Sequence, residues 1–238
     1  MSAMQRIRLG ARVILLKPGE QGGLETFLTP GPEDISSFGF PGGVVEKQDY
    51  SSGMLKRCRG LSGAAARKIM GAHLSPQQAM APWVAAIRSL FLEVGVLLAV
   101  DENGQDPMRY PNWWIRMQSQ RAALRAARFS FESLLVEHGL WADIATLRYF
   151  SSWRLSNQES TDVDSHFYLV TLPHELEERY SVLSTSSRAA WLRPDRAILL
   201  CARGELAMDF STFASLRTLA DFNSMESLVR EYGHGRRP

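Results

Sequence analysis

The 238-residue chain is poor in cysteine, in lysine and in net charge. Its two cysteines, Cys58 and Cys201, lie far apart and form no Cys-x-x-Cys pair, which excludes a disulfide framework and a structural zinc site built on thiolates. With 27 basic and 25 acidic side chains, the charge gives no reason to expect nucleic acid or a membrane to bind over the whole surface.

Long hydrophobic runs are also missing. No stretch approaches the ~20 apolar residues of a membrane-spanning helix, and the run Val13–Leu16 is too short for a signal peptide. The scarcity of cysteine fits a reducing compartment, so we expect a cytoplasmic location without membrane contact. The sequence contains no P-loop, no G-x-G-x-x-G, no G-x-S-x-G and no H-E-x-x-H motif, which removes several common enzyme classes.

What is present is an ordinary globular composition, 45% hydrophobic, with strand and helix patterns in mixed order. No repeat and no linker rich in proline or serine divides the chain, so we expect a single domain over residues 1–238. The patterns predict strands at Ile7–Leu16, Leu24–Leu28, Gly39–Glu46, Val96–Val100, Leu147–Leu155 and His166–Thr171. They predict helices at Ala64–Met70, Pro76–Glu93, Trp113–His138, Pro194–Leu200 and Thr212–Phe222. Pro173 closes the last strand, and Ser211 is the N-cap of the last helix. This order predicts an α/β (α+β) sandwich around a mixed sheet.

Two segments carry the functional argument when they are taken together. The first is Phe40–Asp49 (FPGGVVEKQD), and the second is Ala85–Val96 (AAIRSLFLEVGV). Here the chain resembles the Nudix hydrolases, whose motif is G-x5-E-x7-R-E-U-x-E-E-x-G-U, where U is a bulky apolar residue. The motif begins at Gly43, places Asp49 at the first Glu, and finds matches at Arg88, Leu90, Glu93, Gly95 and Val96.

The spacing departs from the motif at one place. Residues 50–87 separate Asp49 from Arg88, where the motif has seven residues. The stretch at about 50–80 is therefore expected to be an insertion rather than core, which either caps the active-site cleft or forms a dimer contact. With an insertion at this place, the chain resembles the branch of Nudix hydrolases that contains the peroxisomal coenzyme A diphosphatase of mammals. Matches at Phe131–Leu140, Ser152–Trp153, His166–Leu169, Trp191–Pro194 and Gly204–Glu205 extend the resemblance over most of the chain.

The chemistry of such a site depends on carboxylates. Diphosphate hydrolysis needs a divalent ion that neutralises phosphate oxygens and activates water, and Mg²⁺ prefers oxygen ligands in octahedral geometry. Carboxylates at positions i, i+3 and i+4 of a helix lie on one face and can converge on a metal. In this chain those positions hold Ser89, Leu92 and Glu93, so one carboxylate of three is present. We therefore expect a weakened or abolished metal centre.

The resemblance implies roles for the remaining residues. Gly43, Glu46 and Glu93 would hold Mg²⁺ or Mn²⁺, Gly43 through its carbonyl, and Glu93, Asp49 and Arg88 would form the catalytic group. With Ser89 in place of the motif's Glu, Arg88 is expected to have lost the carboxylate that it orients. Carboxylates from elsewhere could complete the site, with Asp162, Asp164, Glu177 and Glu178 as candidates.

Each of these residues also has a structural interpretation. Glu93 is either a metal ligand or a carboxylate at a helix end, and Glu46 and Asp49 are either supporting acids or an ordinary polar turn. For Arg88 we favour a structural ion pair over a catalytic role. Trp113 and Trp114 either stack on a base or anchor the core. A solvated helix face is favoured over phosphate binding for four arginines, Arg116, Arg121, Arg125 and Arg128.

Two functional hypotheses follow. The first is a Nudix-type hydrolase of a nucleoside diphosphate derivative, with coenzyme A or acyl-CoA as the substrate that the resemblance implies. The second is a catalytically inactive Nudix-fold protein that binds a nucleotide-like ligand or a protein partner. The family favours the first, whereas Ser89 and Leu92 favour the second. In either case we expect a nucleotide-like small molecule as partner, allow for a homodimer, and do not expect nucleic acid binding.

Overall fold

The computed structural model describes residues 7–19, 23–31, 36–156, 162–172 and 188–233. Its strands are β1 (Arg8–Pro18), β2 (Leu24–Pro30), β3 (Ser37–Gly39), β4 (Gly42–Val44), β5 (Cys58–Arg59), β6 (Ala99–Val100), β7 (Trp141–Asp143), β8 (Arg148–Ser156), β9 (Asp162–Thr171), β10 (Ala190–Leu192) and β11 (Ala207–Met208). Its α-helices are α1 (Ser52–Lys56), α2 (Gly63–Met70), α3 (Pro76–Val94), α4 (Pro111–Arg125), α5 (Phe131–Glu137), α7 (Pro194–Ala202), α8 (Phe210–Ala220) and α9 (Met225–Gly233). Short 3-10 helices η1 (Lys47–Tyr50), η2 (Pro107–Arg109) and η3 (Ile144–Thr146) connect them.

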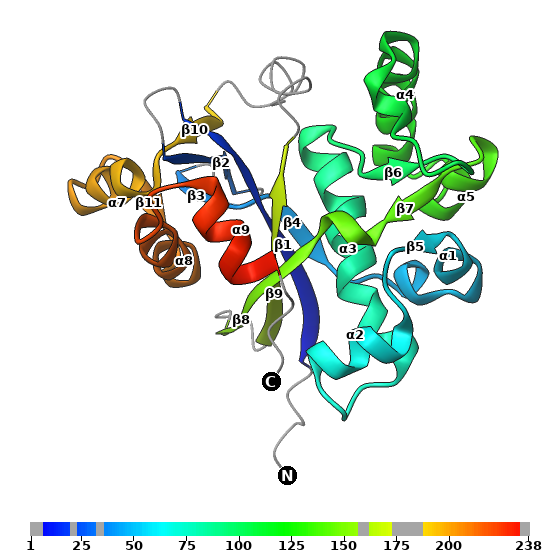
Figure 1. The fold of residues 1–238 in the computed structure, drawn as a ribbon, viewed down its shortest axis with the longest axis horizontal. Helices are drawn as coiled ribbons and strands as arrows, with labels where there is room; N and C mark the ends of the chain where they lie inside the picture. Colours follow the sequence, from blue (N-terminus) through cyan, green and yellow to red (C-terminus); the bar gives the residue numbers. More distant parts are fainter. Residues whose placement is uncertain (1–6, 20–22, 32–35, 157–161, 173–187, 234–238) are drawn as a thin grey trace.

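The strands form a mixed sheet in the order β11-β3-β2-β1-β9-β8, with β10 beside β2 and β4 beside β1. Strand β1 pairs in parallel with β9 and antiparallel with β2 and β4. A smaller sheet in the order β5-β7-β6 lies beside α5 (Figure 1).

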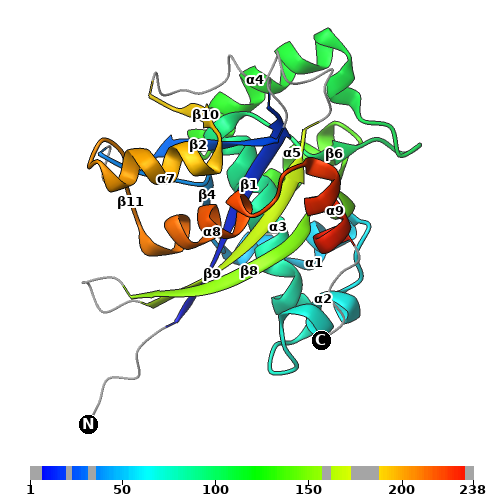
Figure 2. The same ribbon diagram turned by 60° about the vertical axis from the view of Figure 1, so that its left-hand side comes forward.

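Alternate residues of β1 divide the core into two layers. Val13 and Leu15 pack in one hydrophobic cluster with α3, and Ile14 and Leu16 pack in a second cluster that includes residues of α7, α8 and α9. Side chains of a strand point alternately to the two faces of its sheet, so helices cover both faces. Figures 1 and 2 show α3 on one side and α7, α8 and α9 on the other. The α/β/α sandwich around a mixed sheet is thus confirmed.

Helix α3 has the ends that the sequence predicts. Ser75 and Gln78 form a capping box, in which Gln78 N–H donates to Ser75 Oγ at 3.2 Å and Ser75 N–H to Gln78 Oε1 at 3.0 Å. Gly95 ends the helix with φ of +85°, a left-handed conformation that favours glycine. Between these ends nearly every side chain from Ala79 to Phe91 is buried. The helix therefore provides a fixed support for the residues near its C-terminal end.

The inserted segment is more integrated than the sequence suggests. Met54, Ala66 and Met70 are buried in the core cluster around α3, so the expectation that residues 50–80 lie outside the core is wrong for these side chains. Strand β5 pairs with β7, and Ser51 Oγ donates to Glu132 Oε2 at 2.7 Å. The charged and glycine-rich composition of the segment does not indicate these contacts, because their partners are distant in the sequence.

Other boundaries also differ from the sequence-based expectations. Of the strand expected at Val96–Val100, the last two residues pair as β6, and the helix expected at Trp113–His138 is divided into α4 and α5. Helix α8 begins two residues earlier than expected, because Asp209 rather than Ser211 caps it, accepting from Thr212 N–H at 2.7 Å. Pro173 lies outside the described residues.

The break between α4 and α5 centres on Ala127, whose φ is +53°. This conformation costs a non-glycine residue about 1–2 kcal/mol. We expect Ala127→Gly to raise the free energy of unfolding by up to about 1 kcal/mol, since the relief of strain exceeds the added entropy of the unfolded chain. Urea denaturation measures this. Ala126→Gly is the matched control, because Ala126 has φ of −81° and glycine should destabilise there; equal effects at both positions would contradict the account.

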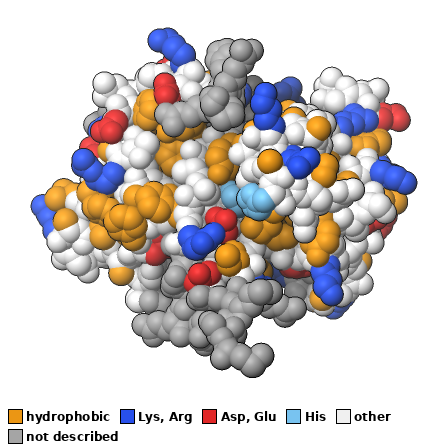
Figure 3. All heavy atoms as spheres, turned by 90° about the horizontal axis from the view of Figure 1, so that it is seen from below, with side chains coloured by type: hydrophobic (Ala, Val, Ile, Leu, Met, Phe, Trp, Pro, Cys, Tyr) orange, Lys and Arg blue, Asp and Glu red, His pale blue; other side chains and the backbone are white. Residues whose placement is uncertain are grey.

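The surface has mixed character. On the face shown in Figure 3, the Lys and Arg side chains are dispersed among hydrophobic and acidic ones. Within the described part of the chain, no helix is both long enough and apolar enough to cross a membrane.

Candidate functional site

A cleft of about 640 Å³ opens beside the C-terminal part of α3. Residues of β2, β4, α3 and the turn between α4 and α5 line it. The lining residues are Phe27, Thr29, Pro30, Gly42, Gly43, Val44, Glu46, Gln48, Arg88, Ser89, Leu92, Glu93, Leu124, Arg125, Ala127, Phe129, Ser130, Phe131 and Ala189. No residue of 50–80 is among them, so the inserted segment does not cap this cleft where the structure describes it.

The helix face that would carry the metal ligands points into this cleft. Ser89, Leu92 and Glu93 all line it, as the i, i+3, i+4 spacing predicts. These positions present a hydroxyl, an alkyl group and a carboxylate. The placement of the motif on α3 is therefore consistent with the geometry, although the ligand set is incomplete.

The glycines of β4 let the strand approach both β1 and α3 closely. A Cβ on Gly42 would collide with the Ala11 carbonyl oxygen, and a Cβ on Gly43 would lie 2.6 Å from Ser89 Oγ. This contact brings Gly43 against the helix position where the motif has a carboxylate. Glycine is required at position 42 because backbone atoms of β1 would meet a Cβ there, whereas at position 43 the side chain of Ser89 alone stands in the way.

Glu93 is held against β4. Its Oε2 accepts a hydrogen bond from Gly42 N–H at 3.1 Å. Burial raises the pKa of the Glu93 carboxyl above its ordinary value, and the Gly42 N–H together with the charges of Arg12, Arg125 and Arg121 oppose the increase. The surroundings of this carboxylate therefore contain more arginine than the sequence motif suggests.

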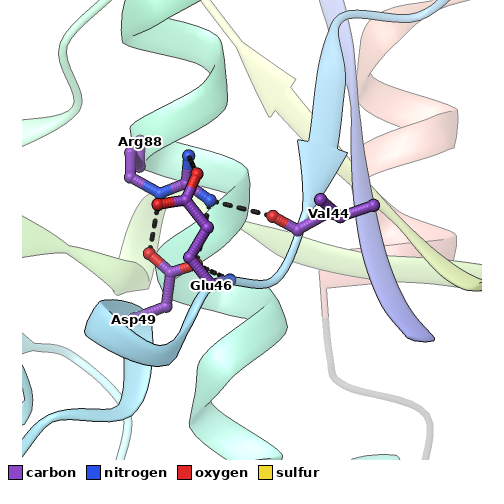
Figure 4. Close-up of polar contacts among 4 residues, drawn as sticks. All are labelled: Val44, Glu46, Asp49 and Arg88. Carbon is purple, nitrogen blue, oxygen red and sulfur yellow. Dashed lines mark hydrogen bonds and ion pairs between the residues drawn. The ribbon is translucent and has the colours of Figure 1, made fainter. Parts of the chain in front are cut away.

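Arg88 lies at the centre of a network of acidic partners (Figure 4). Its Nε donates to Asp49 Oδ1 at 2.7 Å, and its Nη2 donates to Asp49 Oδ2 at 2.9 Å and to the Val44 carbonyl at 2.9 Å. Its Nη1 lies 2.9 Å from Glu46 Oε1. The carboxylate that the motif places at position 89 is absent, as expected, and Asp49, from the far side of the inserted segment, pairs with Arg88 instead.

The same network engages the carboxylates of both Asp49 and Glu46. Asp49 is 1% exposed and also accepts from Glu46 N–H at 2.8 Å, so each of its oxygens has a donor. Burial alone would lower the pKa of the Arg88 guanidinium, but the hydrogen bonds and charge of Asp49 and the charge of Glu46 raise it. The three side chains form a structural ion-pair network, which is the interpretation favoured for Arg88. The proposed catalytic and metal-binding roles of Asp49 and Glu46 stay predictions.

The described residues do not fit the expected Mg²⁺ or Mn²⁺ centre. No group of three or more His, Cys, Asp or Glu side chains among them is arranged to hold a metal ion. Glu93 and the Gly43 carbonyl remain near the cleft, but Ser89 and Leu92 supply no charge, and Leu92 is apolar where a hydrated ion would lie. Of the other candidate acids, Asp162 and Asp164 lie on β9, and Glu177 and Glu178 are outside the described residues.

Helix α4 contributes residues whose role the sequence does not reveal. Arg116, Arg125 and Arg128 are exposed, as expected for a solvated face, but Arg121 is 6% exposed. Arg121 donates to the Leu92 carbonyl at 3.0 Å and to the Glu93 carbonyl at 2.6 Å, which satisfies carbonyls at the end of α3 and complements the helix dipole. No local signal distinguishes Arg121 from its neighbours, because its partners belong to another helix.

The aromatic residues of the cleft are also missing from the sequence-based set. Phe27, Phe129 and Phe131 line it, whereas Trp113 and Trp114 do not. The two tryptophans are half-buried and pack against the core cluster, consistent with anchors. The downstream match that begins at Phe131 was the available signal for this wall of the cleft.

Comparison with known proteins supports this description of the fold. No family model and no curated protein sequence matches the chain. Among solved structures, a Nudix hydrolase from Alicyclobacillus acidocaldarius matches with a TM-score of 0.72 and 20% identity, over 96% of this chain and 97% of that one. A mutT/nudix family protein from Listeria innocua has a TM-score of 0.45, 12% identity and coverage of 94% and 96%.

The fold is therefore that of the Nudix hydrolases. The Alicyclobacillus structure is alike over nearly the full length of both chains, so the resemblance inferred from the two motif segments holds for the whole architecture. The narrower resemblance to the coenzyme A diphosphatase branch stays a prediction.

Proposed function

We propose that the chain binds a nucleotide-like, phosphorylated small molecule in the cleft beside α3 and does not hydrolyse it through a metal cluster on that helix. The observation that carries the proposal is the face made by Ser89, Leu92 and Glu93, which lines the cleft with one carboxylate of three. Loss of a single supporting residue of a metal site already costs about 10–100-fold in affinity or activity, so the loss of two ligands is expected to cost more.

The cleft itself supports a small organic ligand. Its volume of about 640 Å³ is within the range of ligand sites. Phe129 is half-buried and supplies apolar surface, with Phe27 and Phe131 packed behind it at 2% and 3% exposure, and the guanidinium of Arg125 supplies a positive charge. Binding of a nucleotide-like molecule uses both features.

A second candidate function is metal-dependent hydrolysis of a diphosphate such as coenzyme A or acyl-CoA. Glu93 beside the Gly43 backbone favours it, together with the Nudix fold. This function requires ligands beyond the three α3 positions.

One set of candidate ligands, tested for both binding and turnover, distinguishes the two functions. Coenzyme A, acyl-CoA, ADP-ribose, NADH and nucleoside triphosphates are incubated with the protein and Mg²⁺ or Mn²⁺, and product release is measured beside binding by calorimetry. We expect binding of at least one compound with no turnover above the protein-free rate. The control is Glu93→Gln, which keeps an oxygen for the Gly42 N–H. Turnover that Glu93→Gln abolishes would overturn the proposal in favour of hydrolysis.

A further inference from the structure

The surroundings of Glu93 are more positive than those of a carboxylate metal site. The charges of Arg12, Arg121 and Arg125 all act on Glu93. Arg12 reaches it from β1, where it pairs with Gly42, the residue whose N–H binds Glu93. Arg121 and Arg125 come from successive turns of α4, which stands beside the C-terminal end of α3 (Figure 1). Positive groups therefore surround Glu93. In the complete motif, two further acids would stand beside it and attract a metal ion.

Most of the arginines near Glu93 already bind groups of the protein itself. Arg88 is bound to Asp49, Glu46 and the Val44 carbonyl, and Arg121 to the carbonyls at the end of α3. Arg12 donates to the Phe40 carbonyl at 3.3 Å. These contacts hold the positive groups in place, and neither Arg12 nor Arg121 is among the residues that line the cleft.

Arg125 is different. It is exposed and lines the cleft, and among the described residues none forms an ion pair or a hydrogen bond with its guanidinium. Its five N–H donors are thus available on the wall that faces Glu93. A guanidinium can bind a phosphate group through two parallel hydrogen bonds, which an ammonium group cannot do.

We propose that the cleft binds the phosphate groups of its ligand directly through arginine, with Arg125 as the principal contact and without a divalent metal ion. Arginine in this arrangement replaces the positive charge that a metal ion supplies. The neighbouring Phe129, which is half-buried, places an apolar surface next to Arg125. The ligand class is therefore a phosphate ester or diphosphate that carries an aromatic or apolar group.

This inference rests on the proposed function, and its test uses ADP and pyrophosphate as probes. Affinity is measured by calorimetry on the full chain with excess EDTA and again with excess Mg²⁺. We expect ADP to bind equally well in both conditions, and more tightly than pyrophosphate, which lacks the aromatic group. Added KCl should weaken binding of both probes, since the contact is between exposed charges.

The decisive variant is Arg125→Gln. We expect it to lower the affinity for ADP by about tenfold to 100-fold, the usual range for a hydrogen bond to a charged group. Arg125→Lys should fall between the two, because it keeps the charge and loses the paired donors. Arg128→Gln is the matched control, since Arg128 is exposed on the same turn and does not line the cleft.

The outcomes separate the inference from the proposed function. ADP binding that requires Mg²⁺ and survives Arg125→Gln would overturn the arginine contact and leave ligand binding intact. Equal losses in Arg125→Gln and Arg128→Gln would overturn the site, because they indicate general charge attraction. Absence of binding for both probes and for the whole panel, in folded protein, would overturn the proposed function as well.

Discussion

Alanine in place of Asp49 is expected to lower the free energy of unfolding by about 3–5 kcal/mol, the range for removal of one partner from a buried ion pair. Asp49 is 1% exposed and binds Arg88 through both carboxylate oxygens. Without it, the Arg88 guanidinium keeps the Val44 carbonyl and the half-exposed Glu46 but loses its buried counter-charge. Equilibrium denaturation in urea, followed by circular dichroism, measures the loss.

Glu46→Gln is the matched control for this prediction. The Glu46 side chain is 51% exposed, so its ion pair with Arg88 is worth less than about 1 kcal/mol. The double variant Asp49→Ala, Arg88→Ala should lose less than the sum of the two single losses, because each single change leaves a buried charge unpaired. Additive losses, or a loss below 1 kcal/mol in Asp49→Ala, would show that the buried pair does not hold η1 against α3.

This ion pair also explains how far the site could be predicted from the sequence. The general fold followed from patterns that act locally. Ser75 and Gly95 define the ends of α3 through backbone geometry, and the apolar residues of Ile7–Leu16 mark the strand that forms β1. Such features depend on neighbours in the chain, so sequence reasoning found them.

The partners of Arg88 and Arg121 could not be found in this way. Asp49 and Arg88 are separated by the inserted segment, and Arg121 binds carbonyls that carry no sequence signal. The break at Ala127 was also missed, since alanine is a strong helix former and its left-handed conformation is set by tertiary packing. What the sequence did indicate correctly is the composition of the α3 face, because three positions on one helix turn depend on spacing alone.

That face carries the second large prediction. The double change Ser89→Glu, Leu92→Glu is expected to create a site that binds Mn²⁺ at least about 100-fold more tightly than the parent, since even supporting residues alter metal affinity by about 10–100-fold. The new carboxylates would join Glu93 on the wall of the cleft, beside Gly43. Titration of Mn²⁺, followed by electron paramagnetic resonance, measures the affinity of each protein.

The matched control is Ser89→Gln, Leu92→Gln, which has the same side-chain size and no charge. It should bind Mn²⁺ no better than the parent, and Glu93→Gln added to the double glutamate variant should remove the gain. A parent that already binds Mn²⁺ as tightly as the double glutamate variant would mean that other residues complete the site. No gain in the double variant would mean that the site is lost at further positions, or that the motif is misplaced on α3.

The same double change connects metal binding to phosphate binding. Two added negative charges beside Glu93 oppose an anionic ligand in the absence of metal, and they offer Arg125 an acidic partner. Binding of ADP in EDTA should therefore become weaker in the double glutamate variant and recover when Mn²⁺ is added. The uncharged glutamine pair should leave metal-free binding close to that of the parent. A variant that binds ADP equally well with and without Mn²⁺ would separate the α3 face from the phosphate position, and would place the ligand elsewhere in the cleft.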